Sequence, residues 1–193
     1  MNLKMLPLLV AACGLSACAS VPTQYLTLTP ETQAAREVSF GTLQGKGLPL
    51  LIAHVQMPAN LDRLYLTREQ SRNRLKVADH VRWIAPLSGM AQRVLAQDMA
   101  VVLPHKTVFM PGDPTPEGPY LLLRVVVQRF MPTDSGQVEL NADWFVLNTS
   151  TRQIVAQGRS SLQAASRQHP RDQAAAMSQL LADLAQTVAA HLR

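Results

Sequence analysis

The side chains best able to do chemistry in this chain are two cysteines, five histidines and a scatter of carboxylates. The histidines form no H-E-x-x-H motif, and no Gly-x-Ser-x-Gly elbow is present. The paired hydroxyls Ser160 and Ser161 fit a strand better than a nucleophile. Ordinary structural interpretations suffice for the carboxylates of Asp62, Asp79, Asp98 and Asp143. We therefore predict that the protein is not an enzyme and binds no metal.

One cysteine has a more specific context. Lys4 precedes an apolar run, residues 5–15, which is too short to span a bilayer but suits the apolar part of an export signal. Two small residues then stand directly before Cys18, in the sequence Leu15-Ser16-Ala17-Cys18. This sequence resembles the lipobox of bacterial lipoproteins, which implies cleavage after Ala17 and acylation of Cys18. The alternative is an ordinary secretory signal with an incidental cysteine.

The lipobox resemblance sets the expected layout: a signal peptide at residues 1–17, a short acylated tether at 18–23 and a periplasmic α/β domain at 24–193. Two or more acyl chains hold a protein stably on a membrane. The residue after Cys18 is Ala19, not the aspartate that commonly retains such lipoproteins at the inner membrane. We therefore expect an outer-membrane anchor facing the periplasm. Because Cys13 leaves with the signal, no disulfide is expected, and no cofactor beyond the acyl chains on Cys18.

Hydrophobic patterning predicts an α/β fold of the α+β type, with a single domain and a mainly antiparallel sheet that packs two principal helices on one face. Apolar residues recur at helical spacing over Leu87–Leu103, between two prolines, and over Arg171–Arg193. Alternation predicts an antiparallel meander of Tyr120–Phe130, Gln137–Leu147 and Gln153–Leu162. Shorter strands are expected at Tyr25–Leu28, Leu48–Met57, Leu64–Arg68, Arg74–Val77 and Lys106–Met110.

Basic residues gather between positions 62 and 82, where six cations face three acids. The mature chain carries a net charge of only +4, because Lys4 leaves with the signal. One interpretation is a solvated face with an Asp–Arg pair that orders a turn. The other is a contact surface for anionic lipid headgroups or an acidic partner, since guanidinium groups bind phosphate and carboxylate through paired hydrogen bonds. The candidate contact residues are Asp62, Arg63, Arg68, Arg82 and Trp83, of which Trp83 suits either the core or an exposed contact.

Short motifs recur in a recognisable order along the chain. They are Pro58…Leu61-Asp62-Arg63…Arg68, then Arg82-Trp83…Pro86-Leu87, then Leu140…Ala142…Trp144. Together with the lipobox, this pattern resembles the ABC-type transport auxiliary lipoproteins, the group that includes paraquat-inducible protein C.

The resemblance implies a non-enzymatic, outer-membrane lipoprotein in an envelope lipid-transport system. Its expected partner is an MCE-type protein, anchored in the inner membrane and bridging the periplasm, and the resemblance also permits a homo-oligomeric ring. Phospholipid is a further expected ligand, whereas nucleic acid is not, because the compartment is wrong and no recognised module is present. Two other functions stay open: a periplasmic lipid or lipopolysaccharide carrier, and an anchored hydrolase.

Overall fold

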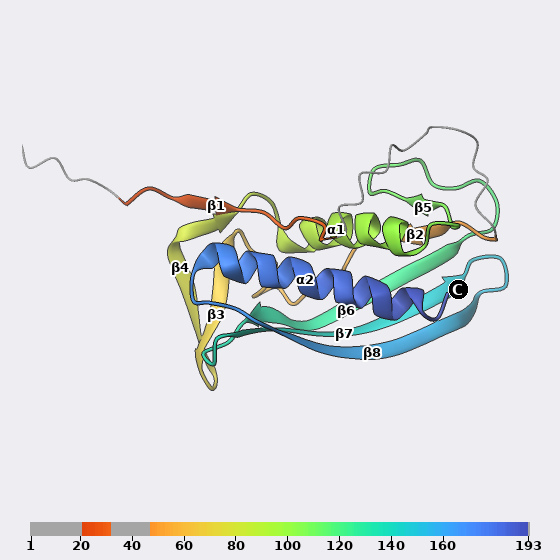
Figure 1. Ribbon diagram of the computed structural model, residues 1–193. Helices are drawn as coiled ribbons and strands as arrows, with labels where there is room; N and C mark the ends of the chain where they lie inside the picture. Colours follow the sequence, from red (N-terminus) through yellow and green to blue (C-terminus); the bar gives the residue numbers. More distant parts are fainter. Residues whose placement is uncertain (1–20, 32–46, 193) are drawn as a thin grey trace, which may run out of the picture.

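The computed structural model describes residues 21–31 and 47–192, arranged as eight strands and two helices (Figure 1). The predicted signal peptide and the predicted acylation site at Cys18 lie outside these described residues. The elements in chain order are β1 (Gln24–Leu26), β2 (Leu50–Ile52), β3 (Tyr65–Ser71), β4 (Arg74–Trp83), α1 (Leu87–Val102), β5 (Val108–Phe109), β6 (Leu121–Pro132), β7 (Gln137–Asn148), β8 (Gln153–Ala165) and α2 (Pro170–Ala189).

The strands form two sheets. A three-stranded sheet has the order β1-β4-β3, with β1 parallel and β3 antiparallel to β4. A five-stranded sheet has the order β5-β2-β6-β7-β8, in which β5, β2 and β6 are parallel and β6, β7 and β8 form an antiparallel meander. This confirms the predicted α+β fold with mainly antiparallel pairing. The parallel pairs join segments that lie far apart in the sequence.

The five-stranded sheet has one covered face. In β7 every second residue is buried, from Val138 to Val146, while the residues between them are half-buried. Both helices lie over the buried face in Figure 1, where they contact each other and α2 contacts β7 and β8. This agrees with the predicted packing of two helices on one face.

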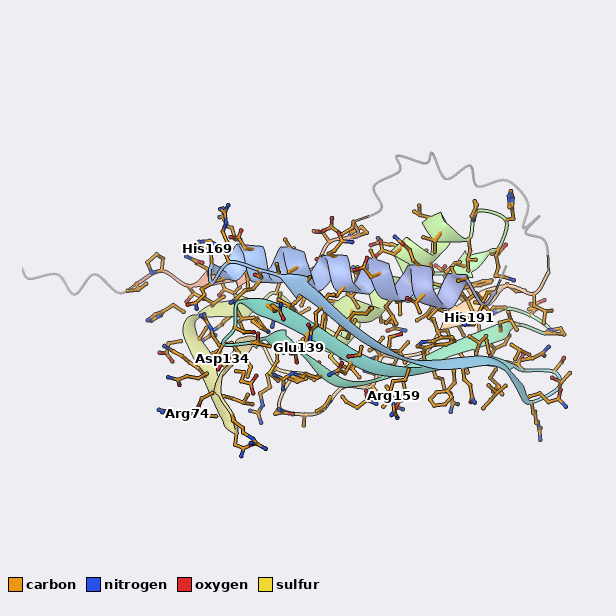
Figure 2. The ribbon with its side chains drawn as sticks, turned by 60° about the horizontal axis from the view of Figure 1, so that its bottom comes forward. Arg74, Asp134, Glu139, Arg159, His169 and His191 are labelled. Carbon is orange, nitrogen blue, oxygen red and sulfur yellow. The ribbon has the colours of Figure 1, made fainter. Side chains whose placement is uncertain are left out.

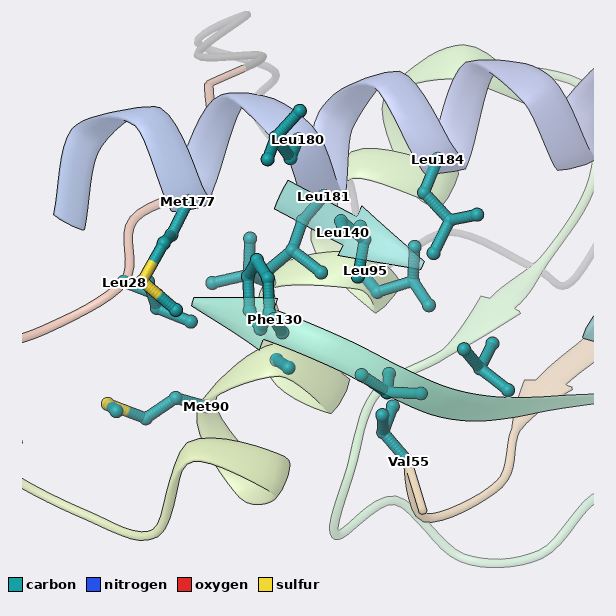
Figure 3. Close-up of a cluster of buried hydrophobic side chains, with 14 of the residues drawn as sticks. Leu28, Val55, Met90, Leu95, Phe130, Leu140, Met177, Leu180, Leu181 and Leu184 are labelled. Atoms are coloured by element: carbon teal, nitrogen blue, oxygen red, sulfur yellow. The ribbon is translucent and has the colours of Figure 1, made fainter. Parts of the chain in front are cut away.

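The space between the helices and the sheet is filled with side chains. Figure 3 shows Leu180 and Leu184 of α2 beside Leu140 of β7, with Phe130 of β6 close by. These four residues are at most 1% exposed. A polar bond also ties α1 to the sheet, because the Gln92 amide donates to the Ile52 carbonyl oxygen at 2.9 Å. The result is a dense core in which a lost methylene is expected to be costly.

The helix boundaries follow local chemistry. Helix α1 starts directly after Pro86 and ends one residue before the predicted Leu103. Helix α2 is shorter than predicted, since it ends at Ala189. The residues after it close into a tighter turn, in which the backbone N–H of Leu192 donates to the Ala189 carbonyl oxygen at 3.0 Å.

Candidate functional site

The predicted contact residues lie at the end of the molecule where the three-stranded sheet stands (Figure 1). Val21, the first described residue, leads into β1 at this end. The predicted anchor, Cys18, is three residues earlier in the sequence. Only about 10 Å of fully extended chain therefore separates the predicted acylation site from this end of the fold.

Asp62 has a structural role that the sequence interpretation missed. Its carboxylate accepts hydrogen bonds from the backbone N–H and the hydroxyl of Ser88, both at 2.9 Å. Ser88 lies in the first turn of α1, where free N–H groups and the helix dipole favour a negative charge. Asp62 thus caps a helix from a distant turn, because Pro86 at the usual capping position supplies no side-chain bond. The expected Asp–Arg pair is not among the ion pairs of the described residues.

Arg82 and Trp83 point to opposite faces of β4, as neighbours in a strand must. Trp83 is 2% exposed and belongs to the core. Of the two placements that the sequence allowed for it, the core and an exposed contact, the structure has the first. Arg82 is half-buried, and its guanidinium carbon lies 4.9 Å from the centre of the Tyr65 ring. This distance is typical of a cation–π contact. Tyr65 was not among the predicted site residues, because the pairing of β3 with β4 is needed to find it.

The remaining predicted arginines are placed differently. Arg63 is exposed, and its Nε donates to the Ala59 carbonyl oxygen at 3.2 Å, within the turn that also holds Asp62. Arg68 is half-buried in β3. The Nε atoms of Arg68 and Arg82 are buried without a hydrogen-bond partner among the described residues. Unsatisfied buried donors are uncommon and are a reason to look for function nearby.

The hairpin of β3 and β4 carries exposed cations towards its tip. Arg72, Arg74 and Lys76 are all exposed, and so are the apolar side chains of Leu75 and Val77. Figure 2 shows Arg74 standing away from the body of the protein. The tip therefore presents positive charge interspersed with apolar surface.

An ion network joins this hairpin to the five-stranded sheet. Arg129 of β6 contacts Glu69 of β3 and Glu139 of β7, each at 2.5 Å. All three side chains are about one quarter exposed. Their separation in the sequence gave no sign of this network. One consequence is that Glu69 of this hairpin is paired with Arg129 and not with the cations at the hairpin tip.

A second ion pair lies on the open face of the five-stranded sheet, where Figure 2 labels Arg159. Its Nε is 2.7 Å from a carboxylate oxygen of Asp143 on the neighbouring strand. The hydrogen bond from Arg159 holds the pKa of Asp143 below its usual value, with a smaller contribution from Gln128. The Asp143 carboxylate in turn raises the pKa of Arg159. These shifts belong to an exposed, structural pair.

A hollow of about 410 Å³ lies between the end of β8 and the start of α2. It combines alanines with charged and polar side chains, including Glu31, Arg167 and Asp172.

Residues 21–31 and 47–192 contain no group of three or more histidine, cysteine or acidic side chains placed to hold a metal ion. Within the same ranges, neither helix has the length and apolar character needed to cross a membrane.

Two solved structures share the fold. One is described only as an uncharacterized protein; it has a TM-score of 0.65 and 18% sequence identity, covering 89% of this chain and 97% of its own. The other is a protein of Xanthomonas campestris from the family DUF330, with a TM-score of 0.62 and 17% identity, covering 86% of this chain and 90% of its own. No curated protein matches the chain significantly in sequence.

The family comparison covers nearly all of the described structure. A model of the ABC-type transport auxiliary lipoprotein component matches residues 26–189, from β1 to the end of α2. The match includes the turn of Asp62, the helix that it caps and both sheets. It bears out the family resemblance of the short motifs. The chain belongs to the ABC-type transport auxiliary lipoprotein family, and so is a lipid-anchored partner of a transport system.

Proposed function

We propose that this lipoprotein is anchored in the outer membrane and docks an MCE-type protein that reaches it from the inner membrane. The observation that carries the proposal is the family match over residues 26–189. The match supports a non-enzymatic auxiliary role in an envelope lipid-transport system, with the ABC transporter at the other side of the periplasm. The choice of membrane depends on Ala19, which follows the predicted acylation site.

The packing of the domain favours docking over lipid carriage. A carrier needs an apolar cavity between sheet and helices, as wide as an acyl chain. In this protein that layer is occupied by side chains such as Trp144, Leu180 and Leu184, which are at most 2% exposed. The hollow beside α2 is lined partly by charged groups and suits an acyl chain poorly. A solid body that offers surfaces is better suited to joining other components than to enclosing a lipid.

The proposal is tested by affinity capture from detergent-solubilised envelopes with the tagged full-length protein. We expect an MCE-type protein among the captured components, identified by mass spectrometry.

A matched Ala19→Asp variant tests the choice of membrane. It keeps Cys18 and should place the lipoprotein in the inner-membrane fraction of a density gradient, while the unchanged protein is found in the outer-membrane fraction.

Two results would contradict the proposal. Capture of the transporter without any MCE-type protein would refute the docking partner. Recovery of the unchanged protein in the inner-membrane fraction would refute the outer-membrane location. A Cys18→Ser variant, which cannot be acylated, should fail to sediment with either membrane if the anchor is the acyl group.

A further inference from the structure

The outer face of the three-stranded sheet carries a row of three neighbouring side chains, in which the two outer ones, both tyrosines, are exposed and the central arginine is half-buried. Tyr25 of β1 and Tyr65 of β3 are both register partners of Arg82 in β4. The residues that follow them, Leu26, Leu66 and Trp83, are all buried on the opposite face. Tyr25 is 68% exposed and Tyr65 is 37% exposed. The sheet therefore presents a Tyr–Arg–Tyr row to its surroundings.

Apolar residues extend this row. Ile84 lies two positions after Arg82, and its backbone N–H donates to the Leu26 carbonyl oxygen at 2.9 Å, which continues the sheet by one residue. Ile84 is 68% exposed, and Val21 ahead of β1 is 62% exposed. Tyrosine is enriched where a membrane meets water, and arginine lays its alkyl stem on apolar surface while its charge reaches the headgroups. The composition of this face matches a lipid interface.

The charge at the same end of the molecule complements anionic lipid. The exposed cations are Arg63 and the hairpin residues Arg72, Arg74 and Lys76. Asp79 and Asp134 are exposed acids at this end, and Asp62 keeps its negative charge while it accepts hydrogen bonds from Ser88, whereas Glu69 is paired with Arg129. The four exposed cations therefore outnumber the three acids at this end that have no partner among the described ion pairs. Each Lys or Arg near an anionic bilayer surface adds to the attraction.

The tether decides which end of the domain meets the bilayer. If Cys18 carries the acyl chains, the three residues to Val21 extend at most about 10 Å. The end that carries β1 must then lie close to the headgroups. We propose that the outer face of the three-stranded sheet, centred on Tyr25, Arg82 and Tyr65, rests on an anionic lipid surface. This inference depends on acylation at Cys18 but not on the identity of the docking partner.

Site-specific spin labelling of the full-length, acylated protein tests this orientation. Acylation of Cys18 and loss of Cys13 with the signal leave the mature chain without a free thiol, so an introduced cysteine is labelled alone. The test position is Ile84→Cys, and the control is Thr151→Cys in the turn between β7 and β8, at the opposite end of the molecule (Figure 1). The protein is reconstituted into vesicles of phosphatidylcholine with phosphatidylglycerol.

We expect collisions of the Ile84→Cys label with a water-soluble nickel chelate to fall several-fold relative to the Thr151→Cys label, while collisions with oxygen rise. The protection should weaken in pure phosphatidylcholine vesicles, and also when Arg82→Gln is added in anionic vesicles. Equal chelate exposure at both positions would overturn the proposal, and so would equal protection in neutral and anionic vesicles.

Spin–spin broadening at Ile84→Cys would assign the face to contact between copies of the chain and would also overturn the proposal. These outcomes are independent of the affinity capture, because the vesicles contain no partner protein. A failed capture with a protected Ile84→Cys label would leave the membrane face standing and refute only the docking role.

Discussion

The five-stranded sheet and the three-stranded sheet differ in what covers their faces. The five-stranded sheet carries two helices on one face and, on the other, side chains such as Asp143 and Arg159 that pair with each other. The three-stranded sheet also buries one face, through residues such as Leu66 and Trp83. Its other face exposes Tyr25 and Ile84, each at 68%.

The two sheets are therefore expected to differ in whether their side chains stabilise the fold or contact other molecules. Apolar side chains of the five-stranded sheet and its helices are removed from water by the fold itself, so truncating them should weaken folding. The exposed side chains of the three-stranded sheet gain little from folding. Their truncation should instead alter what the protein touches.

The largest effect is expected from truncating a leucine between the helices and the sheet. Leu184→Ala in α2 removes a side chain that is fully buried, so it should lower the free energy of unfolding by about 2–5 kcal/mol. The matched change Ile84→Ala, on the exposed face, should be nearly neutral. Urea unfolding followed by fluorescence reports both sheets, since Trp83 lies in one and Trp144 in the other. Similar losses of unfolding free energy in the two variants would contradict the expected difference between the two sheets.

A glycine on β8 should be nearly as sensitive. A Cβ atom at Gly158 would lie 2.8 Å from Cε2 of the buried Trp144 ring, and the ring would have to move. Gly158→Ala should therefore destabilise the protein by about 1–3 kcal/mol. The control is Gly89→Ala in α1, where an added methyl meets nothing within 4 Å. It should stabilise the protein by about 0.5–1 kcal/mol, because glycine is unfavourable inside a helix. A thermal melt distinguishes the opposite signs.

A smaller effect is expected at the contact between the turn of Asp62 and the start of α1. Asp62→Asn removes the negative charge that caps α1 through Ser88, and should cost about 1 kcal/mol of unfolding free energy. Ser88→Ala keeps the bond to the backbone N–H and loses only the hydroxyl bond, so it should cost less. Chemical denaturation of both variants tests the order. An Asp62→Asn protein as stable as the unchanged one would show that the cap does not hold the helix.

The secondary structure and fold class were predictable because they depend on local pattern. Helix α1 was located to within one residue, since Pro86 and Pro104 leave little choice for its ends. The meander was evident from the strict alternation in β7. The hairpin was less regular, because register shifts interrupt the pairing of β3 with β4. Alternation breaks down at such irregularities.

The candidate site was only partly predictable. The basic segment pointed to Arg82, but its companions Tyr25 and Tyr65 reach it through the pairing of three strands, one of them parallel. Parallel strands are not joined by a short turn, so no local sequence signal predicts their pairing. In the same way, the capping role of Asp62 depends on a turn and a helix that meet only in the folded chain. Residue types were informative here, whereas their contacts required the tertiary structure.

The smallest expected effect concerns the open face of the five-stranded sheet. Folding lowers the pKa of Asp143, chiefly through the hydrogen bond from Arg159, so the pair stabilises the fold above the unfolded-state pKa and loses that contribution as pH falls through the lowered value. Because the Arg159 side chain is 80% exposed, water and salt screen the pair and little stability is at stake. Arg159→Gln should therefore raise the pKa of Asp143, measured by carboxyl NMR, without a clear change in unfolding. An unchanged pKa would mean that the pair does not persist in solution. Arg82→Gln should alter the contact with lipid and leave the pKa of Asp143 unchanged, because Arg82 lies on the other sheet.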